Sequence, residues 1–426
     1  MIRKLLNKLR GVGKEGLFHI FGSGAFAKIG GLISSMVVIR DLPKVAYGGF
    51  VDADNLYAYL AGFIGLGLQN TVMQYCSESI TEDRRSAIYG YSLKTGTLGN
   101  FLLTLAILLL SAWKRSRGDT IQADYLMMMC GLPFLTYVNH FFQIILRVKL
   151  KNSDYAKTNM VYVTFHVGGN ILMTLLWGVP GLIFSMYVAH AAAAIRSALV
   201  LRKDDLFTGI RTTQIRLTRA DRKEYLSYAL VYALTTFASA VLVLLDVTCL
   251  ELVLNDSAIL ADYKVAATIP SACLFIPGSL TIFFYPKLVK AFSESRAAGG
   301  SQLKNLVKVY LGVNGVITLG MLVCAPLIIW IIFGQKYMNV VPIFRILSVN
   351  YLAASLRNLT SHVFAVLKKV KANLFFSIVS GVLNICLNLL LIPVLGSPGA
   401  AIATLTVTCV ILMLNGIYLI RYLKEA

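Results

Sequence analysis

Long apolar stretches, separated by short polar breaks, recur along the whole chain. Each is about long enough for a helix to cross roughly 30 Å of hydrocarbon. Together they predict an all-α polytopic membrane protein with about twelve spans. The spans cover residues 17–39, 48–74, 87–112, 122–146, 158–177, 180–201, 225–245, 262–285, 306–333, 341–366, 372–393 and 399–420.

The basic residues predict the orientation of these spans. The chain has 40 Lys and Arg against 20 Asp and Glu. Most of the basic residues fall in alternate loops, and such loops face the cytoplasm. We therefore expect both termini to be cytoplasmic. The basic start "MIRKLLNKLRGVGK" has no convincing small-residue cleavage site, so we expect a retained tail rather than a signal peptide.

Composition excludes several classes of function. The chain is 57% hydrophobic and only 14% charged, against about 25% charged in an ordinary soluble domain. A nucleic-acid site needs a continuous basic face, whereas short basic loops meet anionic lipid headgroups. The seven cysteines lack CxxC or histidine-partner spacing. We expect no nucleic-acid partner, no metal site and no cofactor.

The longest loop divides the chain into two predicted bundles of six spans each. The bundles cover residues 1–201 and 225–426, and residues 202–224 form a cytoplasmic linker between them. The outer loops are all short and leave no room for an extracytoplasmic domain.

A faint repeat links the two halves. "NHFFQIILRVKLKN" from Asn139 resembles "SHVFAVLKKVKAN" from Ser361, and "NILMTLL" from Asn170 resembles "NICLNLL" from Asn384. Each copy runs on into a proline turn and a helix rich in small residues. Two copies in the same orientation are an arrangement of many transporters, with the site between the halves near the midplane.

Short strings in order along the chain resemble the polysaccharide transporters, and most closely the O-antigen (Wzx-type) flippases, of the multidrug/oligosaccharidyl-lipid/polysaccharide (MOP) flippase superfamily. They are "IRDLPKVAYGGF", "GLGLQNTVMQYCSE", "LLDVTCLELVL", "ADYKVAATI", "FFYPKLVKAF", "IIFGQKYMNVVPIFRIL" and "GSPGAAIATL". The chain departs from the family pattern at Pro43, where glycine is usual, and at Gln74, where a basic residue is common. The two additional spans typical of lipid II flippases are absent.

The resemblance implies a fold of two six-helix bundles, similar to the multidrug (MATE) exporters, and a function in the bacterial inner membrane. That function is movement of an undecaprenyl-pyrophosphate-linked oligosaccharide, such as an O-antigen repeat unit, from the cytoplasmic to the outer leaflet by alternating access. The implied partners are this lipid-linked oligosaccharide, membrane lipids, H+ or Na+, and other polysaccharide-assembly proteins. The resemblance also implies that the protein is a transporter and not an enzyme.

A pyrophosphate that crosses the membrane needs a wet, cationic cavity, so basic residues within spans are the first candidates. Lys28 and Arg357 lie too deep to reach the headgroups easily, and Lys94 lies a turn or two inside its span. Small residues at helical spacing from Lys28 indicate a face that is not directed at lipid. Two roles stay open for Lys28. It either contacts substrate in the cavity or locks two helices by pairing with Asp52 or Asp54.

Ion coupling requires groups that change charge or hold a cation. The candidates are Asp52, Asp54 and Asp246, together with His140, which titrates near neutral pH. His166 and His190 are further histidines within spans. A lone histidine in a helix is more often a hydrogen-bonded packing residue, and Asp246 could simply be solvated at the outer surface.

Two alternative functions stay open at this point. A drug or organic-cation exporter of the same superfamily would need an acidic cavity, because its substrates are cationic. A membrane polysaccharide polymerase or ligase would need a large outer loop with a carboxylate, histidine or paired-arginine site.

Overall fold

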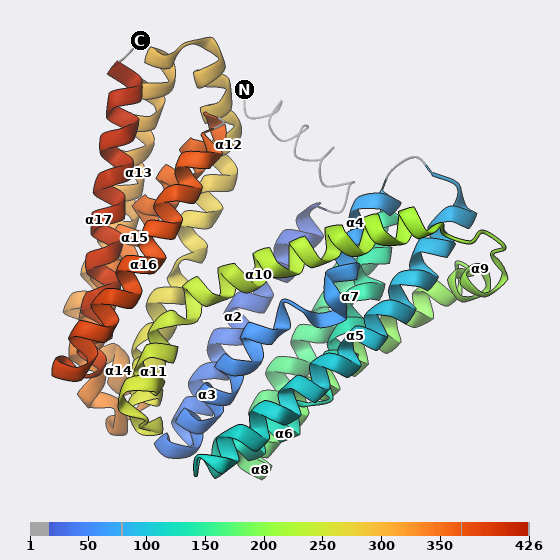
Figure 1. Cartoon of the computed structure of the whole chain (residues 1–426). Coiled ribbons are helices and arrows are strands. Elements are labelled where there is room, and N and C mark those ends of the chain that lie inside the picture. Colours follow the sequence, from blue (N-terminus) through green and yellow to red (C-terminus); the bar gives the residue numbers. More distant parts are fainter. Residues whose placement is uncertain (1–16, 78–79, 368, 425–426) are drawn as a thin grey trace. The chain divides into compact units, whose positions relative to one another are not determined.

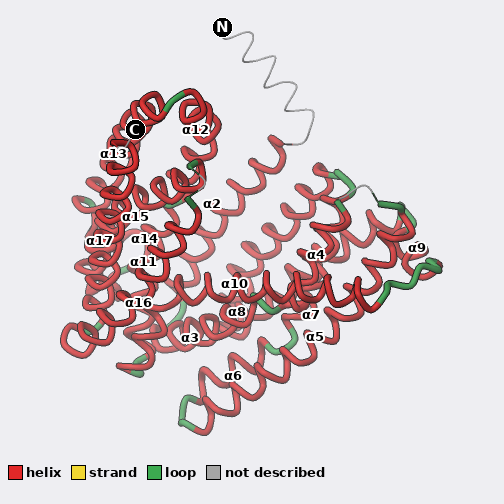
Figure 2. Tube along the Cα trace, turned by 45° about the horizontal axis from the view of Figure 1, so that its top comes forward, coloured by secondary structure: helices red, strands yellow, loops and turns green. Residues whose placement is uncertain are grey.

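The computed structural model describes residues 17–77, 80–367 and 369–424, and all regular elements in these ranges are helices (Figure 2). The predicted basic tail, residues 1–14, lies outside the described residues. The chain forms two compact units, Met1–Val243 and Leu244–Ala426.

The N-terminal unit holds the first helices and the predicted linker. Its elements are α2 (Leu17–Asp41), α3 (Lys44–Ala61), the 3₁₀ turn η1 (Ile64–Gly67), α4 (Leu68–Cys76), α5 (Glu82–Ser116), α6 (Thr120–Met129), α7 (Leu132–Val148), α8 (Asn152–Arg202), α9 (Leu206–Thr212) and most of α10 (Arg219–Leu254). Helix α9 packs against α5 and α8. The linker is therefore attached to this unit.

The C-terminal unit begins inside α10, so this one helix contributes to both units. Its other elements are α11 (Ser257–Cys273), α12 (Phe275–Glu294), α13 (Arg296–Val323), α14 (Ala325–Phe333), the 3₁₀ turn η2 (Gln335–Val340), α15 (Val341–Val366), α16 (Val370–Leu395) and α17 (Ser397–Lys424). Within this unit α13, α15, α16 and α17 run side by side (Figure 1).

The prediction of an all-α polytopic membrane protein is confirmed. Eight of the described helices are long and apolar enough to cross a membrane, or nine if the two parts of α10 form one span. All twelve predicted spans fall on helical structure, although η1 interrupts the second of them. The number of crossings and the cytoplasmic location of the termini stay predictions.

Helix α8 folds back on itself and so contains two of the predicted spans. Gly178 has φ 62° and ψ −140°, outside the helical region. A methyl group on Gly181 would lie 1.9 Å from the carbonyl oxygen of Met173, which requires the chain to reverse between them. Further along, Arg196 lies 3.7 Å from Asp154. The two arms of α8 are therefore antiparallel.

The same turn occurs between α16 and α17. Gly396 has φ 64° and ψ −141°, and a methyl group on Gly399 would lie 2.4 Å from the carbonyl oxygen of Leu391. In sequence the turns read Gly-Val-Pro-Gly from Gly178 and Gly-Ser-Pro-Gly from Gly396. Each glycine takes a backbone conformation that only glycine adopts readily.

These matching turns support the faint repeat between the halves and correct its register. Asn170 stands as far before Gly178 as Asn388 stands before Gly396. The counterpart of Asn170 is therefore Asn388, one helical turn beyond the Asn384 that sequence similarity suggested. Each of these asparagines contacts a polar side chain one turn earlier, His166 in the first copy and Asn384 in the second.

A substitution in the turn tests the need for glycine. Nothing lies within 4 Å of a methyl group placed on either Gly396 or Gly416, but only Gly396 has a positive φ. We expect Gly396→Ala to destabilise the protein by about 1–3 kcal/mol through backbone strain. We expect Gly416→Ala, inside α17, to be neutral or stabilising. Thermal unfolding of the purified variants in detergent measures both, and equal midpoints would contradict this account.

Candidate functional site

Lys28 lies on the face of α2 that points away from the packing within its unit. The opposite face carries Gly30, where a methyl group would lie 2.9 Å from Val167 of α8, and the buried Ser34. Lys28 is exposed, and nothing lies within 4 Å of a methyl group placed on Gly31 of the same face. This side of α2 is therefore open.

The helix-locking role suggested for Lys28 is wrong. Among the described residues Lys28 has no ion pair, and Asp52 pairs instead with Lys114, at 2.8 Å. Asp52 and Lys114 are only 1% and 4% exposed, and Asp119 lies 3.4 Å from the same ammonium group. Removing one partner of such a buried pair would leave an uncompensated charge. The pair joins α3 to the end of α5.

Asp54, the other acidic residue considered as a partner for Lys28, is half-buried on α3. It follows Asp52 by two residues, so the two carboxylates point in different directions around the helix. The structure brings Asp52 together with Lys114 and Asp119 rather than with Asp54 or Lys28.

Arg357 is a half-buried cation on α15 of the C-terminal unit. Its guanidinium group donates to the Ser380 hydroxyl of α16 at 3.4 Å, a long hydrogen bond. Within the described residues it has no carboxylate partner. A cation at the membrane centre is unfavourable by about 2.5–3.5 kcal/mol unless water or a ligand compensates it. Its unpaired donors suit a phosphate.

A polar cavity of about 470 Å³ lies within the N-terminal unit. Side chains from α4, α7, α8 and α10 line it, and none of its lining residues is acidic. His140 and Arg147 of α7 both line the cavity, and Arg147 also lies over the ring of Tyr155, 5.6 Å from its centroid. The cavity therefore offers cationic and hydrogen-bonding groups to a ligand.

Polar contacts connect the wall of this cavity to two further histidines. The Gln143 amide donates to Asn139 at 2.8 Å, and the Asn139 amide lies 3.2 Å from Nδ1 of His190. Tyr162 packs between His190 and His166, with ring centroids 4.9 and 5.5 Å away. The ring of His140 lies 6.0 Å from that of His190.

The structure thus brings together the three histidines that the sequence places on separate spans. Protonation of one of these histidines would disfavour protonation of the others, because like charges at this range repel.

Asp246 accepts hydrogen bonds from three other helices of the C-terminal unit. The Tyr263 hydroxyl of α11 donates at 2.6 Å and the Asn388 amide of α16 at 2.9 Å. The Thr404 hydroxyl of α17 donates to the same carboxylate. Asp246 is therefore a partly buried junction of this unit and not a freely solvated surface residue.

Oxygen atoms around Asp246 are suitable ligands for a monovalent cation. The side-chain oxygen of Asn388 is buried and accepts no hydrogen bond in the structure. The Asn384 oxygen accepts a hydrogen bond from the Asn388 amide, and the Thr404 hydroxyl accepts one from the Asn384 amide. Such oxygens suit Na+ better than they suit transition metals. No cluster of His, Cys, Asp and Glu in the described part of the chain could hold a metal ion.

Lys94 does not line the polar cavity that His140 lines. It is exposed on α5 and lines a pocket of about 400 Å³ between α5 and the linker. Arg216 and Arg222 line the same pocket. Lys94 is therefore grouped with linker cations and not with the polar cavity of the N-terminal unit.

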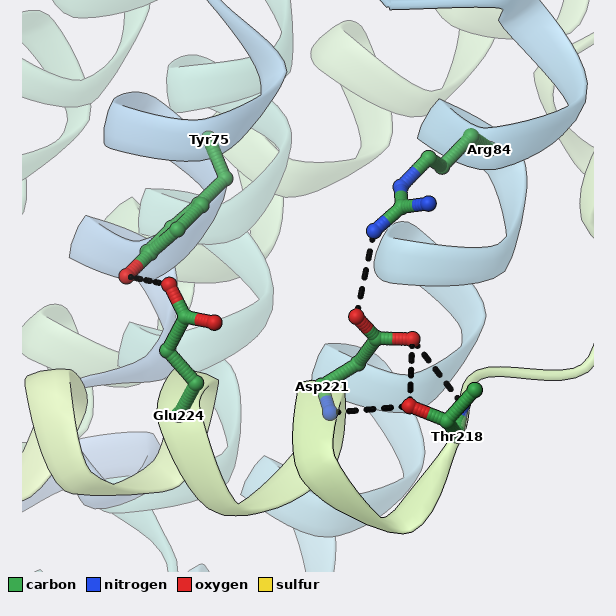
Figure 3. Close-up of polar contacts among 5 residues, drawn as sticks. All are labelled: Tyr75, Arg84, Thr218, Asp221 and Glu224. Atoms are coloured by element: carbon green, nitrogen blue, oxygen red, sulfur yellow. Dashed lines mark hydrogen bonds and ion pairs between the residues drawn. The ribbon is translucent and has the colours of Figure 1, made fainter.

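The start of α10 is fixed to α4 and α5 by polar contacts beside this pocket (Figure 3). Thr218 and Asp221 form a reciprocal cap, in which the Thr218 N–H donates to the Asp221 carboxylate at 3.0 Å and the Asp221 N–H donates to the Thr218 hydroxyl at 3.1 Å. Arg84 reaches the same carboxylate at 3.1 Å, and the Tyr75 hydroxyl donates to Glu224 at 2.9 Å.

The electrostatics of the cap keep its carboxylate charged. The Thr218 backbone N–H, followed by the Thr218 hydroxyl and the Arg84 guanidinium, lowers the pKa of Asp221 below its usual range. Asp221 is therefore ionised at neutral pH and holds Arg84.

Sequence reasoning missed several of the residues that build these sites. Asn139 and Gln143 stand out in the sequence only as part of the repeat, and Thr404 only within the "GSPGAAIATL" string. The sequence places Arg147 among the basic residues of a cytoplasmic loop rather than in a cavity. The repeat could have identified Asn388, because the two glycine turns fix its register and make Asn388 the counterpart of Asn170. Polar residues one turn apart on an apolar helix, such as Asn384 and Asn388, are a pattern that could have identified this site.

Comparisons with known proteins agree with this fold. The family described as polysaccharide biosynthesis protein matches residues 14–292. A multidrug resistance MATE family transporter of the MOP superfamily, in an inward-facing conformation, has a TM-score of 0.73 at 14% identity, over 94% of this chain and 95% of that one.

Two further solved structures share the fold. The lipid II flippase MurJ, in an inward closed conformation, has a TM-score of 0.71 at 14% identity, over 95% of this chain and 87% of that one. A MOP superfamily transporter from Pyrococcus furiosus has a TM-score of 0.56 at 13% identity, over 96% and 93%. No curated protein matches the chain.

The structural likenesses establish a MATE- and MurJ-like fold, because their identities are too low to establish more. The family match is of a different kind, since it extends over more than half of the 426 residues. The chain therefore belongs to the polysaccharide biosynthesis protein family.

Proposed function

We propose that this protein is a flippase for a polyprenyl-linked oligosaccharide in the bacterial inner membrane. It moves undecaprenyl-pyrophosphate-linked oligosaccharide, the repeat unit of an O-antigen or a related surface polysaccharide, from the cytoplasmic to the outer leaflet. The lipid tail stays in the bilayer while the headgroup passes through the protein by alternating access. Family membership supports the polysaccharide pathway, and the fold supports transport.

The observation that carries this proposal is the pair of cations Lys28 and Arg357. Each lies within a predicted span, and neither has a carboxylate partner among the described residues. By contrast, the buried cation Lys114 is paired with Asp52. Cations left unpaired in apolar helices are compensated by water or by an anion from outside the protein, and a pyrophosphate is such an anion.

The charge of the N-terminal cavity favours an anionic substrate over an organic cation. Arg147 lines this cavity, and no acidic residue does. An exporter of cationic drugs would need acidic groups there, because a cationic wall repels its substrate.

The described loops also favour transport over transfer chemistry. A polymerase or ligase would need a carboxylate, histidine or paired-arginine site in a large outer loop. The connections at the predicted outer side, such as residues 117–119 and 255–256, are only short breaks between helices.

Ion coupling at Asp246 is part of the proposal. The Asp246 carboxylate joins α10 to α11, α16 and α17. A proton or Na+ bound there would change the charge at this junction. Binding that is tighter in one conformation than in the other would shift the balance between conformations.

Deletion of the gene in the source cell tests the proposed function. We expect lipid-linked oligosaccharides to accumulate on the cytoplasmic face of the inner membrane, because synthesis continues while transfer stops. Their leaflet is measured by accessibility to a sugar-modifying enzyme in spheroplasts and in inverted vesicles. Normal surface polysaccharide in the deletion strain would contradict the proposal.

Complementation with variants of the two cations tests the site. We expect Lys28→Ala and Arg357→Ala each to reduce transport about ten- to hundredfold, because each removes a charged hydrogen bond worth about 1.5–3 kcal/mol. Lys28→Arg, which keeps the charge, should retain more transport than Lys28→Ala. Surface polysaccharide is measured in cells with matched levels of membrane-inserted protein.

Arg115→Ala is the matched control for these two variants. Arg115 is an exposed cation that pairs with Asp124, so its loss should leave transport unchanged. Full transport by both Lys28→Ala and Arg357→Ala would rule out the proposed role of these two cations.

An Asp246→Asn variant tests coupling. We expect it to lose the response of transport to an imposed pH or Na+ gradient, because the side chain no longer carries a charge, while transport down the substrate gradient continues. Asp256→Asn is the control, since Asp256 caps α11 through the Ala258 N–H and asparagine preserves such a cap. An unchanged gradient response in Asp246→Asn would exclude this residue from coupling.

A further inference from the structure

The pocket between α5 and the linker lies apart from the sites used in the proposed function. Its volume is about 400 Å³, and its α5 wall runs from Ser86 to Leu98. The opposite wall comes from Ile210 at the end of α9, from the segment that follows α9, and from Arg222 at the start of α10. All of these residues belong to the N-terminal unit.

Contacts between α5 and the linker hold the two walls together. A methyl group on Gly90 would lie 3.3 Å from the Ile210 side chain, so the two segments pack closely. The Thr213 hydroxyl donates to the carbonyl oxygen of Asp83 at 3.1 Å, and the Tyr91 hydroxyl donates to that of Arg222 at 3.3 Å. The pocket is therefore a built feature of this unit and not a gap beside a loose loop.

Three cations line the pocket, and no carboxylate does. Lys94, Arg216 and Arg222 are all exposed. None of them forms an ion pair within the part of the chain that the structure describes. The nearby Asp221 is already held by Arg84 and Thr218. The three cations are thus available to an external anion.

An apolar row on α5 leads away from the pocket. Leu98 lines the pocket, and further along α5 come large apolar side chains at helical spacing. Each is more than half exposed: Leu98, Phe101, Leu102, Leu105 and Leu109. In a membrane protein such a row contacts lipid chains. The pocket therefore stands where an exposed apolar helix surface meets a basic segment that the sequence predicts to be cytoplasmic.

We propose that this pocket binds an anionic phospholipid of the cytoplasmic leaflet. Lys94, Arg216 and Arg222 hold its phosphate, and its acyl chains lie along the exposed row from Leu98 to Leu109. Lys94 then serves a resident lipid and not the transported substrate. Because the bound headgroup bridges α5 and the linker, it stabilises the attachment of the linker to the N-terminal unit.

This proposal is separate from the proposed flipping activity, and direct binding tests it. The purified full-length protein is titrated with phosphatidylglycerol and, separately, with phosphatidylcholine, and bound lipid is counted by native mass spectrometry. We expect preference for phosphatidylglycerol. The triple variant Lys94→Gln, Arg216→Gln, Arg222→Gln should weaken phosphatidylglycerol binding more than about tenfold, because each cation near an anionic lipid adds to the attraction.

A matched triple variant controls for total charge. Arg202→Gln, Lys203→Gln and Arg211→Gln remove the same charge from exposed residues of the same cytoplasmic segment, none of which lines the pocket. We expect this control to bind phosphatidylglycerol as the wild type does. The thermal unfolding midpoint of the first triple variant in phosphatidylcholine nanodiscs shows whether it is as stable as the wild type. If it is less stable, the single variant Arg216→Gln, in the loop, replaces it in the binding measurement.

Four outcomes would overturn the proposal. They are unchanged binding in the pocket variant, equal loss in both triple variants, complete displacement of the lipid by millimolar inorganic phosphate, and preferential binding of undecaprenyl pyrophosphate at the same three cations. The third outcome would make the pocket a site for soluble anions, and the fourth a site for the transported lipid. None of them depends on a transport assay, so failure here leaves the flippase proposal standing.

Discussion

A charged side chain within apolar helices must find an opposite charge, a hydrogen-bond partner or water. The polar features of this chain follow from how each charged group meets that demand. Lys114 and Asp52 satisfy each other at 2.8 Å. Asp246 is satisfied by donors from three helices. Lys28 and Arg357 have no carboxylate partner in the described chain. The first two cases hold helices together, and in the proposed function the third provides cations for an anionic substrate.

The repeated glycine turn places comparable polar residues in the two units. Gly178 and Gly396 adopt nearly the same backbone angles. Across each turn an asparagine contacts a hydroxyl of the following helical segment, Ser185 for Asn170 and Thr404 for Asn384. In the first copy Asn170 contacts His166, and in the second Asn388 donates hydrogen bonds to Asn384 and Asp246. Beside the first turn the asparagine contacts a histidine, and beside the second the corresponding asparagine contacts a carboxylate.

Much of the fold could be predicted from the sequence, because apolar length and the alternation of basic loops directly reflect the bilayer. All twelve predicted spans fall on helices. Ion pairs between helices were harder to predict from the sequence, because any carboxylate on a neighbouring span is a candidate partner for Lys28. Asp52 pairs with Lys114 because α3 packs against α6, the helix that follows α5, and this packing brings Asp52 near the end of α5. No periodicity in the sequence reveals that contact. The grouping of His140, His166 and His190, and of Lys94 with Arg216, likewise depends on packing between distant segments.

The central claim is that the protein itself moves a pyrophosphate-linked sugar lipid between leaflets. The direct measurement uses the purified protein in sealed vesicles that contain undecaprenyl-pyrophosphate-linked oligosaccharide with a labelled sugar. An impermeant glycosidase outside the vesicles reports which leaflet each sugar occupies. The account predicts that the protected half of the label becomes accessible at a rate proportional to the amount of protein. Protection that persists equally with and without protein would contradict it.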